Sequence, residues 1–327
     1  MNNDIIKVDQ LRKIFTDSGK RKSKTVVAVN GIDFRVKENE IFGLLGPNGA
    51  GKTTVMRILC TLISPTAGKV SVLGNDLLKH QAEIRNNIGY VSQKGGLELR
   101  STGRENLIMQ GRLYGMSASE AEKLTDELLK KLDLISISDR RAKTYSGGQR
   151  RLFDLANGII HKPRILFLDE PTTGLDPGSR SQVWEEVKKL HNEGTTIILT
   201  THYLEEADVL CDRVAIINLG KIVELDNPAQ LKRKIIAGDI ISLNFENNDA
   251  LLNSKNILTK ENFVKELQPV DSTLHIYVDE GSRVLPLVIQ LLNNNDLHIQ
   301  AVSLSKPTLD DVFLKLTGRK LIEPEKN

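Results

Sequence analysis

Up to about residue 235, short apolar runs alternate along the chain with segments whose apolar residues recur at helical spacing. The run Ile41 to Leu45 predicts a buried strand, and the spacing within Thr54 to Cys60 predicts a helix directly after it. Ile165 to Leu168 is continuously apolar, which is typical of a parallel strand buried on both faces, and Thr195 to Thr200 predicts another such strand. This part of the chain therefore predicts an α/β fold built on a parallel sheet.

The remaining pattern in this part places a hairpin before the apolar core and a helical insert within it. Other strands are expected at residues 5–8, 26–36, 69–73, 88–92, 213–218 and 221–225, and a helix at 178–191. The first two flank a polar loop at 17–25, as in a hairpin. From Arg104 to about Leu134 the period is helical, with one helix starting at Ser119. Ser146 holds an N-cap-like position before a further helix that runs to about Ile160.

The composition shifts around Ala237-Gly238, after which asparagine is frequent. Strands are expected at 240–245, 274–278 and 298–304, with helices at 284–292 and 309–316 and a further helix between the first two strands. This pattern predicts a small α+β module with its helices on one sheet face. We expect one domain at 1–237, with a helical subdomain at about 94–162, and a second domain at 238–327.

Bulk properties narrow the class of protein. The chain has 327 residues and a formal net charge of +3, which is too small to indicate nucleic-acid binding by itself. The basic cluster at residues 20–24 is best interpreted as a solvated loop, with anionic lipid or nucleic acid as the alternative. Cys60 and Cys211 lie in apolar segments and are expected to be buried in a reducing compartment. The chain shows no signal peptide and no run of about 20 apolar residues, so we expect a cytoplasmic protein.

The segment Gly46-Pro47-Asn48-Gly49-Ala50-Gly51-Lys52-Thr53 matches the spacing G-x-x-x-x-G-K-[ST]. Several backbone N–H groups can meet one phosphate only where side chains are missing and positive φ is allowed, which the glycines provide. The helix that starts at Lys52 adds the positive end of its dipole. Lys52 is expected to reach the β- and γ-phosphates, and Thr53 to bind Mg²⁺. A glycine-rich turn that binds nothing is the alternative, but the strand before and the helix after favour a phosphate loop.

Polar residues follow several of the expected strands, where ligands of parallel sheets gather. Asp169 is placed to hold Mg²⁺, directly or through a water, and Glu170 to orient or deprotonate the water that attacks the γ-phosphate. Glu170 could instead only cap a helix before Pro171. Gln93 could contact Mg²⁺ or the attacking water, and His202 could sense the γ-phosphate, although a histidine at a strand end is more often structural.

These motifs, together with Tyr145-Ser146-Gly147-Gly148-Gln149 and Gly174-Leu175-Asp176, resemble in their order the nucleotide-binding subunit of an ABC transporter. The resemblance covers about residues 4 to 235. It implies a phosphate-loop NTPase fold with a RecA-like core, an antiparallel β subdomain and a helical insert. Ser-Gly-Gly-Gln is the discriminating element, since GTPases and kinases with phosphate loops lack it.

The resemblance also implies a role for each matching position. Phe15 would stack on adenine, although the family usually has Tyr there. The nucleotide would further contact Gly46, Asn48, Gly49, Ala50, Gly51, Lys52, Thr53, Thr54, Ser146, Gly147, Gly148, Gln149 and Asp176. Thr53, Gln93 and Asp169 would bind Mg²⁺, with Glu170 as catalytic base and His202 and Gln93 as further catalytic residues. Tyr145 replaces the commoner Leu, a mild change if its side chain packs inside the protein.

The tail segment Pro307-Thr308-Leu309-Asp310-Asp311-Val312-Phe313 is similar to that of the daunorubicin-resistance type of ATP-binding subunit. An ordinary amphipathic helix would explain its spacing equally well. The resemblance implies an ATPase with ATP and Mg²⁺, working as a head-to-tail dimer of two copies. It would drive export of a drug, lipid or polysaccharide through a separate integral membrane permease at the cytoplasmic face of the cell membrane. The carboxy-terminal extension would stabilise or regulate the dimer, and the permease would set the substrate.

Two other functions compete with export. A soluble ABC-type ATPase could act as a switch on nucleic acid or ribosomes, but the chain has a single cassette and little net positive charge, so no nucleic-acid partner is expected. An importer ATPase would share the same cassette, and only the tail resemblance argues against it.

Overall fold

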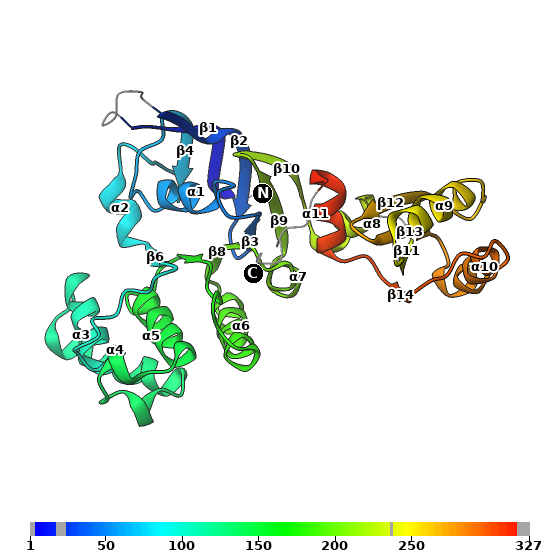
Figure 1. The fold of residues 1–327 in the computed structure, drawn as a ribbon. Helices are drawn as coiled ribbons and strands as arrows, with labels where there is room; N and C mark the ends of the chain where they lie inside the picture. Colours follow the sequence, from blue (N-terminus) through cyan, green and yellow to red (C-terminus); the bar gives the residue numbers. More distant parts are fainter. Residues whose placement is uncertain (1–3, 18–23, 236–237, 319–327) are drawn as a thin grey trace. The chain divides into compact units, whose positions relative to one another are not determined.

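A computed structural model describes residues 4–17, 24–235 and 238–318. The chain forms two compact units, Met1–Asn227 and Pro228–Asn327, which we describe separately (Figure 1). The domain boundary expected after residue 237 stays a prediction. Most of the basic cluster at 20–24, the composition shift at residue 237 and the tail after residue 318 lie outside the described residues.

The first unit is centred on a six-stranded sheet. Its strand order is β10 (Lys221–Asp226), β9 (Arg213–Asn218), β3 (Ile41–Leu45), β8 (Thr196–Thr201), β7 (Ile165–Asp169) and β6 (Ile88–Val91). The five strands from β9 to β6 are parallel, and β10 pairs antiparallel with β9 at one edge. Every residue of β3, β7 and β8 is buried, which confirms that their apolar runs belong to two-sided core strands. Because the strands are parallel, Asp169 and Thr201 reach the same edge of the sheet.

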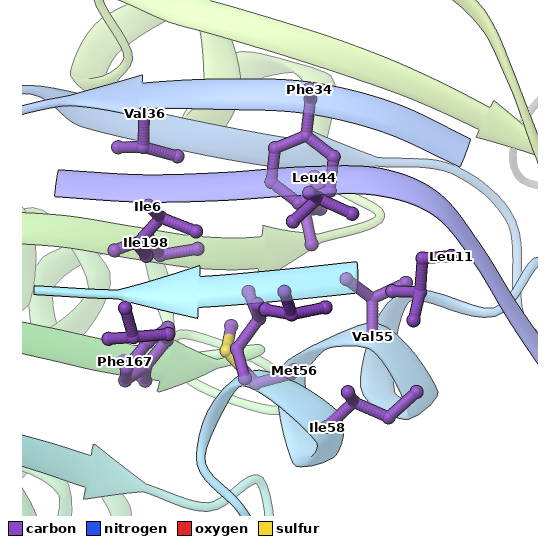
Figure 2. Close-up of a cluster of buried hydrophobic side chains, with 14 of the residues drawn as sticks. Ile6, Leu11, Phe34, Val36, Leu44, Val55, Met56, Ile58, Phe167 and Ile198 are labelled. Atoms are coloured by element: carbon purple, nitrogen blue, oxygen red, sulfur yellow. The ribbon is translucent and has the colours of Figure 1, made fainter. Parts of the chain in front are cut away.

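A second, antiparallel sheet lies over the first. It contains β2 (Lys24–Lys37), β1 (Asp4–Asp17), β4 (Ala67–Val72) and β5 (Asn75–Asp76), in that order, and β1 and β2 form the expected hairpin. Figure 2 shows Phe34 of β2, Leu44 of β3 and Met56 of α1 (Lys52–Leu59) in one buried cluster between the sheets. The ring centroids of Phe34 and Phe42 are 5.3 Å apart in a stacked arrangement. This apolar cluster anchors both ends of the phosphate-loop segment.

Helices make up the rest of the first unit. They are α2 (Gln81–Asn86), α3 (Gly103–Leu113), α4 (Ala118–Lys131), α5 (Gly147–Ile159), α6 (Pro177–Asn192) and α7 (Leu204–Leu210), with short 3₁₀ turns at Ile135–Ile137 and Ala142–Thr144. The expected start at Ser119 was wrong: α4 begins at Ala118, because the Ser117 side chain caps it by accepting from the Glu120 N–H. The predicted cap at Ser146 is confirmed at the start of α5.

The second unit holds an antiparallel sheet in the order β12 (Glu266–Val270), β13 (Thr273–Val278), β11 (Asp239–Asn244) and β14 (Ala301–Ser305). The helices are α8 (Pro228–Ile235), α9 (Asn248–Leu258), α10 (Gly281–Asn293) and α11 (Leu309–Thr317). Ile276 faces the apolar core that α9 and α10 cover. Tyr277 points to the opposite face, where the Lys315 ammonium of α11 lies 5.3 Å from its ring centroid. Helices therefore lie on both faces, so the expectation of a single covered face was wrong.

Within the described ranges, no helix has the length and apolar character required to cross a membrane. Cys60 and Cys211 are buried free thiols, as expected from their apolar surroundings. Burial raises the pKa of both thiols.

Candidate active site at the strand ends

The loop between β3 and α1 needs glycine for two physical reasons. A Cβ on Gly46 would lie 2.2 Å from the Ile217 carbonyl oxygen, and one on Gly51 would lie 2.4 Å from that of Ala28. Gly49 and Gly51 also have positive φ angles of 80° and 108°. A side chain at these positions would strain the loop or push it off its neighbours. The sequence pattern and the fold therefore require the same glycines.

Lys52 is almost fully buried at the first position of α1. Its Nζ donates to the carbonyl oxygens of Gly46 at 2.6 Å and Pro47 at 3.2 Å, and lies 3.4 Å from Glu170 Oε1. Burial lowers the pKa of this ammonium, while the charge of Glu170 opposes that shift. The side chain thus spans the loop and brings a positive charge to the place where phosphate is expected.

The loop and strand β2 border a hollow of about 520 Å³, within the size range of small-molecule sites. It is lined by Val26, Val27, Ala28, Pro47, Asn48, Gly49, Gly51, Lys52, Thr53, Thr54, Gln93 and Glu170. Phe15 is outside this lining but pairs with Val26 across the hairpin, so the two side chains share a face. Phe15 is 44% exposed, with the Lys13 ammonium 5.1 Å from its ring centroid. A ligand can therefore reach the Phe15 side chain.

The Asp169 carboxylate accepts hydrogen bonds from hydroxyl groups of two other segments. Its Oδ1 accepts from Thr53 Oγ1 at 3.1 Å and from Thr200 Oγ1 at 2.6 Å. Neighbouring ligands of an octahedral Mg²⁺ lie about 3.0 Å apart, so the Thr53 and Asp169 oxygens have the spacing of two adjacent ligands. No group of three or more His, Cys, Asp or Glu side chains is arranged for a metal among the described residues. Two oxygen ligands from the protein, those of Thr53 and Asp169, suit Mg²⁺, which keeps waters and takes phosphate oxygens in its other positions.

Glu170 is the best-connected carboxylate of the site. Its Oε2 accepts from Gln93 Nε2 at 2.8 Å and Thr173 Oγ1 at 3.2 Å, and lies 3.2 Å from His202 Nδ1. Burial raises the pKa of this carboxyl, but the contact with His202 and the charge of Lys52 outweigh burial, so the pKa lies below its usual value. The group is therefore ionised at neutral pH. Gln93 is joined to Glu170 rather than to Asp169, and its metal role stays a prediction.

The segment Ser146 to Gln149 begins α5 and does not line the hollow of the described chain. Ser146 Oγ accepts from the Gln149 N–H at 3.2 Å, and Gln149 Oε1 accepts from the Ser146 N–H at 3.0 Å. Ser146 and Gly147 are exposed. Asp176 caps α6 in a similar way through Ser179, and those hydrogen bonds lower the pKa of its carboxyl. The helix end at Ser146 is thus preformed, accessible and separate from the phosphate loop of its own chain.

Tyr145 packs inside the protein, as its position before Ser146 requires. Its ring stacks on Phe153 with 4.8 Å between centroids. Its hydroxyl accepts from the Gly103 N–H at 3.0 Å and lies within 3.0 Å of the Ile137 and Arg140 carbonyl oxygens. Burial raises the pKa of this hydroxyl. Tyr145 therefore supports the start of α5 from behind.

Three buried polar residues near the site were not singled out from the sequence. Thr200 binds Asp169, Arg151 of α5 contacts the strand ends, and Glu206 Oε1 accepts from Thr172 Oγ1 at 2.7 Å and Trp184 Nε1 at 3.0 Å. Burial raises the pKa of the Glu206 carboxyl. Arg151 carried a usable signal, because helical spacing puts this charged residue on the buried face of α5.

Comparison with known proteins agrees with this geometry. Residues 29–173 match the family model described as ABC transporter, and residues 227–317 match the ATP-binding protein DrrA1-3-like, C-terminal domain. The chain is 40% identical to the daunorubicin resistance ATP-binding protein DrrA2 of Streptomyces coeruleorubidus, covering 90% of this chain and 91% of that protein. It is 38% identical to the Nod factor export ATP-binding protein I of Rhizobium sp. (strain N33), covering 90% and 93%.

A solved structure shares the fold of the first unit. The dimeric post-hydrolysis state of the ATP-binding cassette MJ0796, bound to ADP and Pi, superposes with a TM-score of 0.61 at 25% identity. The match covers 68% of this chain and 98% of that one.

Proposed function

The chain belongs to the ATP-binding subunits of ABC transporters, and we propose that it hydrolyses ATP as a head-to-tail dimer to drive export through a separate membrane permease. The observation that carries the proposal is the Glu170 carboxylate. It lies beside the phosphate loop, ionised, and in contact with Lys52, Gln93 and His202. A carboxylate in that place can accept a proton from a water that attacks the γ-phosphate.

The phosphate loop and Lys52 bind the phosphates in this proposal. Backbone N–H groups of the loop and the amino end of α1 meet the phosphate oxygens. The Lys52 ammonium now donates to two loop carbonyls, and a phosphate would offer it charged acceptors, which form stronger hydrogen bonds. Phe15 stacks on the adenine ring beside Val26. The first contacts with ATP therefore come from residues of one copy.

Mg²⁺ is the cofactor that the Thr53 and Asp169 oxygens fit. Thr53 and Asp169 would hold the ion, whose positive charge would offset the negative charge that develops during phosphoryl transfer. Thr200 keeps Asp169 in place through its hydroxyl. Gln93 and His202 orient the Glu170 side chain. The Gln93 amide also offers a hydrogen bond to the attacking water.

A second copy completes the site. The amino end of α5 exposes Ser146 and Gly147, buries Gly148, and does not line the phosphate hollow of the described chain. One copy thus carries one phosphate loop and one unused anion site, and in a head-to-tail pair each site meets the nucleotide of the other copy. Shifting such a pair from 1:99 to 99:1 closed takes about 5.5 kcal/mol of differential binding. Hydrolysis removes the bridging phosphate and lets the pair open.

The exported substrate is taken to be a drug, lipid or polysaccharide, and the permease selects it. Met109 and Leu113 lie one turn apart on α3 and are 47% and 74% exposed, which supports a docking surface for a protein partner on the helical segment. Through that partner the protein works at the cytoplasmic face of the membrane. The relatives named for drug resistance and Nod factor export favour this function over a switch on nucleic acid or ribosomes.

The decisive experiment uses Glu170→Gln. The variant is expected to bind ATP, to hydrolyse it at no more than about one hundredth of the wild-type rate because the general base is lost, and to accumulate a closed dimer. A tagged Glu170→Gln protein is then recovered from detergent-solubilised membranes with and without ATP and Mg²⁺. Co-purification of a multi-span membrane protein supports a transporter subunit over the soluble switch.

Glu185→Gln is the matched control, because Glu185 is exposed on α6. It should hydrolyse ATP at the wild-type rate. Normal hydrolysis by Glu170→Gln would remove Glu170 from the role of base. Recovery of ribosomes or nucleic acid without a membrane protein would favour the soluble switch instead.

A further inference from the structure

Arg151 is a buried cation whose hydrogen bonds all go to backbone carbonyls. Its Nε donates to the Pro171 oxygen at 2.6 Å, and Nη1 donates to the Ser92 oxygen at 2.8 Å. Nη2 lies 3.2 Å from both the Asp169 and the Glu170 carbonyl oxygens. The residue is only 7% exposed. A buried charge is costly unless it is well solvated by the protein, and here four carbonyl dipoles supply that solvation.

The four carbonyls come from the two segments that carry the reacting side chains. Ser92 immediately precedes Gln93 at the end of β6, and Asp169 to Pro171 surround Glu170 at the end of β7. Glu170 itself has a positive φ of 48°, a conformation that is uncommon for a residue with a side chain. Its N–H is held by the Thr200 carbonyl at 3.1 Å, while its carbonyl is held by Arg151. The backbone of Glu170 is thus clamped from both sides.

We propose that Arg151 is a positioning residue for ATP hydrolysis, which holds Glu170 and Gln93 in their reactive arrangement and ties both to helix α5. This inference rests on the hydrolytic role proposed for Glu170. A guanidinium suits the task, because its planar fork offers five donors in fixed directions, whereas a lysine offers one compact point charge. Arg151 makes no contact with the nucleotide hollow, so it acts through the residues it holds.

The link to α5 gives the clamp a second consequence. This helix starts at Ser146, the point that is proposed to meet the nucleotide of the second copy, and Arg151 lies little more than one turn further along. Moving α5 as a rigid body would move the carbonyls of Ser92 and Glu170 with it. Docking of the second copy at Ser146 would therefore shift the position of the Glu170 carboxylate.

Arg151→Met tests the proposal, because it keeps an unbranched side chain of similar helix propensity but removes every donor. The expected result is a fall in kcat of about 100-fold, the scale of a 1 Å misplacement of a catalytic group. ATP affinity should be unchanged, because Lys52 and Thr53 are untouched. Arg151→Lys should fall between Arg151→Met and the wild type, since it restores the charge but not the fork.

Arg150→Met is the matched control, because Arg150 is the half-buried neighbour on the same helix and its Nε has no hydrogen bond within the described residues. It should keep the wild-type kcat. Thermal unfolding and the stoichiometry of ATP binding are measured for each variant, so that loss of folded protein is separated from loss of rate.

A folded Arg151→Met protein with wild-type kcat would overturn the proposal. Equal losses in ATP affinity and kcat would assign Arg151 a structural role only and overturn it as well. If Arg151→Met does not fold, Arg151→Lys decides by the same criteria. A wrong proposed function would give a different result from a wrong role for Arg151. In that case the wild type would not hydrolyse ATP, or Glu170→Gln would hydrolyse it normally.

Discussion

Two helices of the first unit begin with glycine-rich segments, yet their amino ends are built differently. In the described part of the chain no side chain caps α1, whose N-cap is Gly51. The amino end of α5 is closed by a capping box in which Ser146 and Gln149 satisfy each other's N–H groups. The first end also has a buried lysine, a hydroxyl and two carboxylates around it, whereas Ser146 and Gly147 of the second end are exposed.

This difference separates a complete anion site from a partial one. The uncapped end of α1 has its polar partners already in place and is expected to bind phosphate in a single copy. The α5 end offers a helix dipole and an exposed glycine, Gly147, and does not line the phosphate hollow of the described chain, so it is expected to act only on a nucleotide that is already bound elsewhere. Variants at the two ends should therefore separate ATP binding from hydrolysis.

Of the variants at the two helix ends, Lys52→Ala is expected to have the largest effect. It removes the ammonium that faces the phosphates and leaves Glu170 without its nearest cation. Truncating one partner of a buried charge pair costs about 2–5 kcal/mol, so ATP should bind at least about 30-fold more weakly. Isothermal titration with ATP and Mg²⁺ measures this change. Lys188→Ala, an exposed change on α6, should bind normally, and unchanged affinity in Lys52→Ala would remove the lysine from the site.

A smaller effect, confined to hydrolysis, is expected for Gly148→Ala at the start of α5. The added Cβ would lie 2.5 Å from Ser179 Oγ, next to the Asp176 cap of α6. Relieving that overlap costs about 1–3 kcal/mol and shifts the start of α5 away from α6. The kcat should fall about tenfold or more, while ATP affinity of the single copy stays the same. A parallel loss of affinity would contradict the separation of the two ends.

Gly96→Ala is the control for Gly148→Ala. An added Cβ at Gly96 meets nothing within 4 Å, so the same chemical change is made without overlap. Its kcat should equal that of the wild type.

How much of this site was predictable from the sequence depends on how far its residues lie apart in the chain. The phosphate loop and the Ser146 cap are local, and the strand-end carboxylates follow from apolar runs whose ends are visible in the sequence. The hydrogen bond from Gln93 to Glu170 joins residues from different strands, so only the folded sheet brings the two side chains together. The hydrogen bonds of Arg151 could not be predicted either, because they go to backbone carbonyls, which every residue type carries.

Some secondary-structure elements could not be predicted, for reasons that lie in the local sequence. β12 (Glu266–Val270) was not predicted, because it carries Pro269 and alternates weakly, and proline is typical of edge strands such as this one. Helix α7 is only seven residues long, too short for periodicity to show. The start of α4 was misplaced by the presence of two serines, Ser117 and Ser119, either of which could have capped it.

The smallest effect is expected for Ser146→Ala, which separates the capping role of this serine from its proposed contact with nucleotide. Loss of the cap should lower the free energy of unfolding by about 1 kcal/mol. Thr102→Ala is a close control, because Thr102 and Glu105 form the same capping box at α3 and its loss should cost a similar amount. Chemical denaturation measures both. If Ser146 also contacts the nucleotide of the second copy, only Ser146→Ala should lower kcat, by a few-fold, because one hydrogen bond contributes about 1 kcal/mol. Equal kcat values in the two variants would reduce Ser146 to a helix cap and leave the glycines and the dipole as the whole of the second anion site.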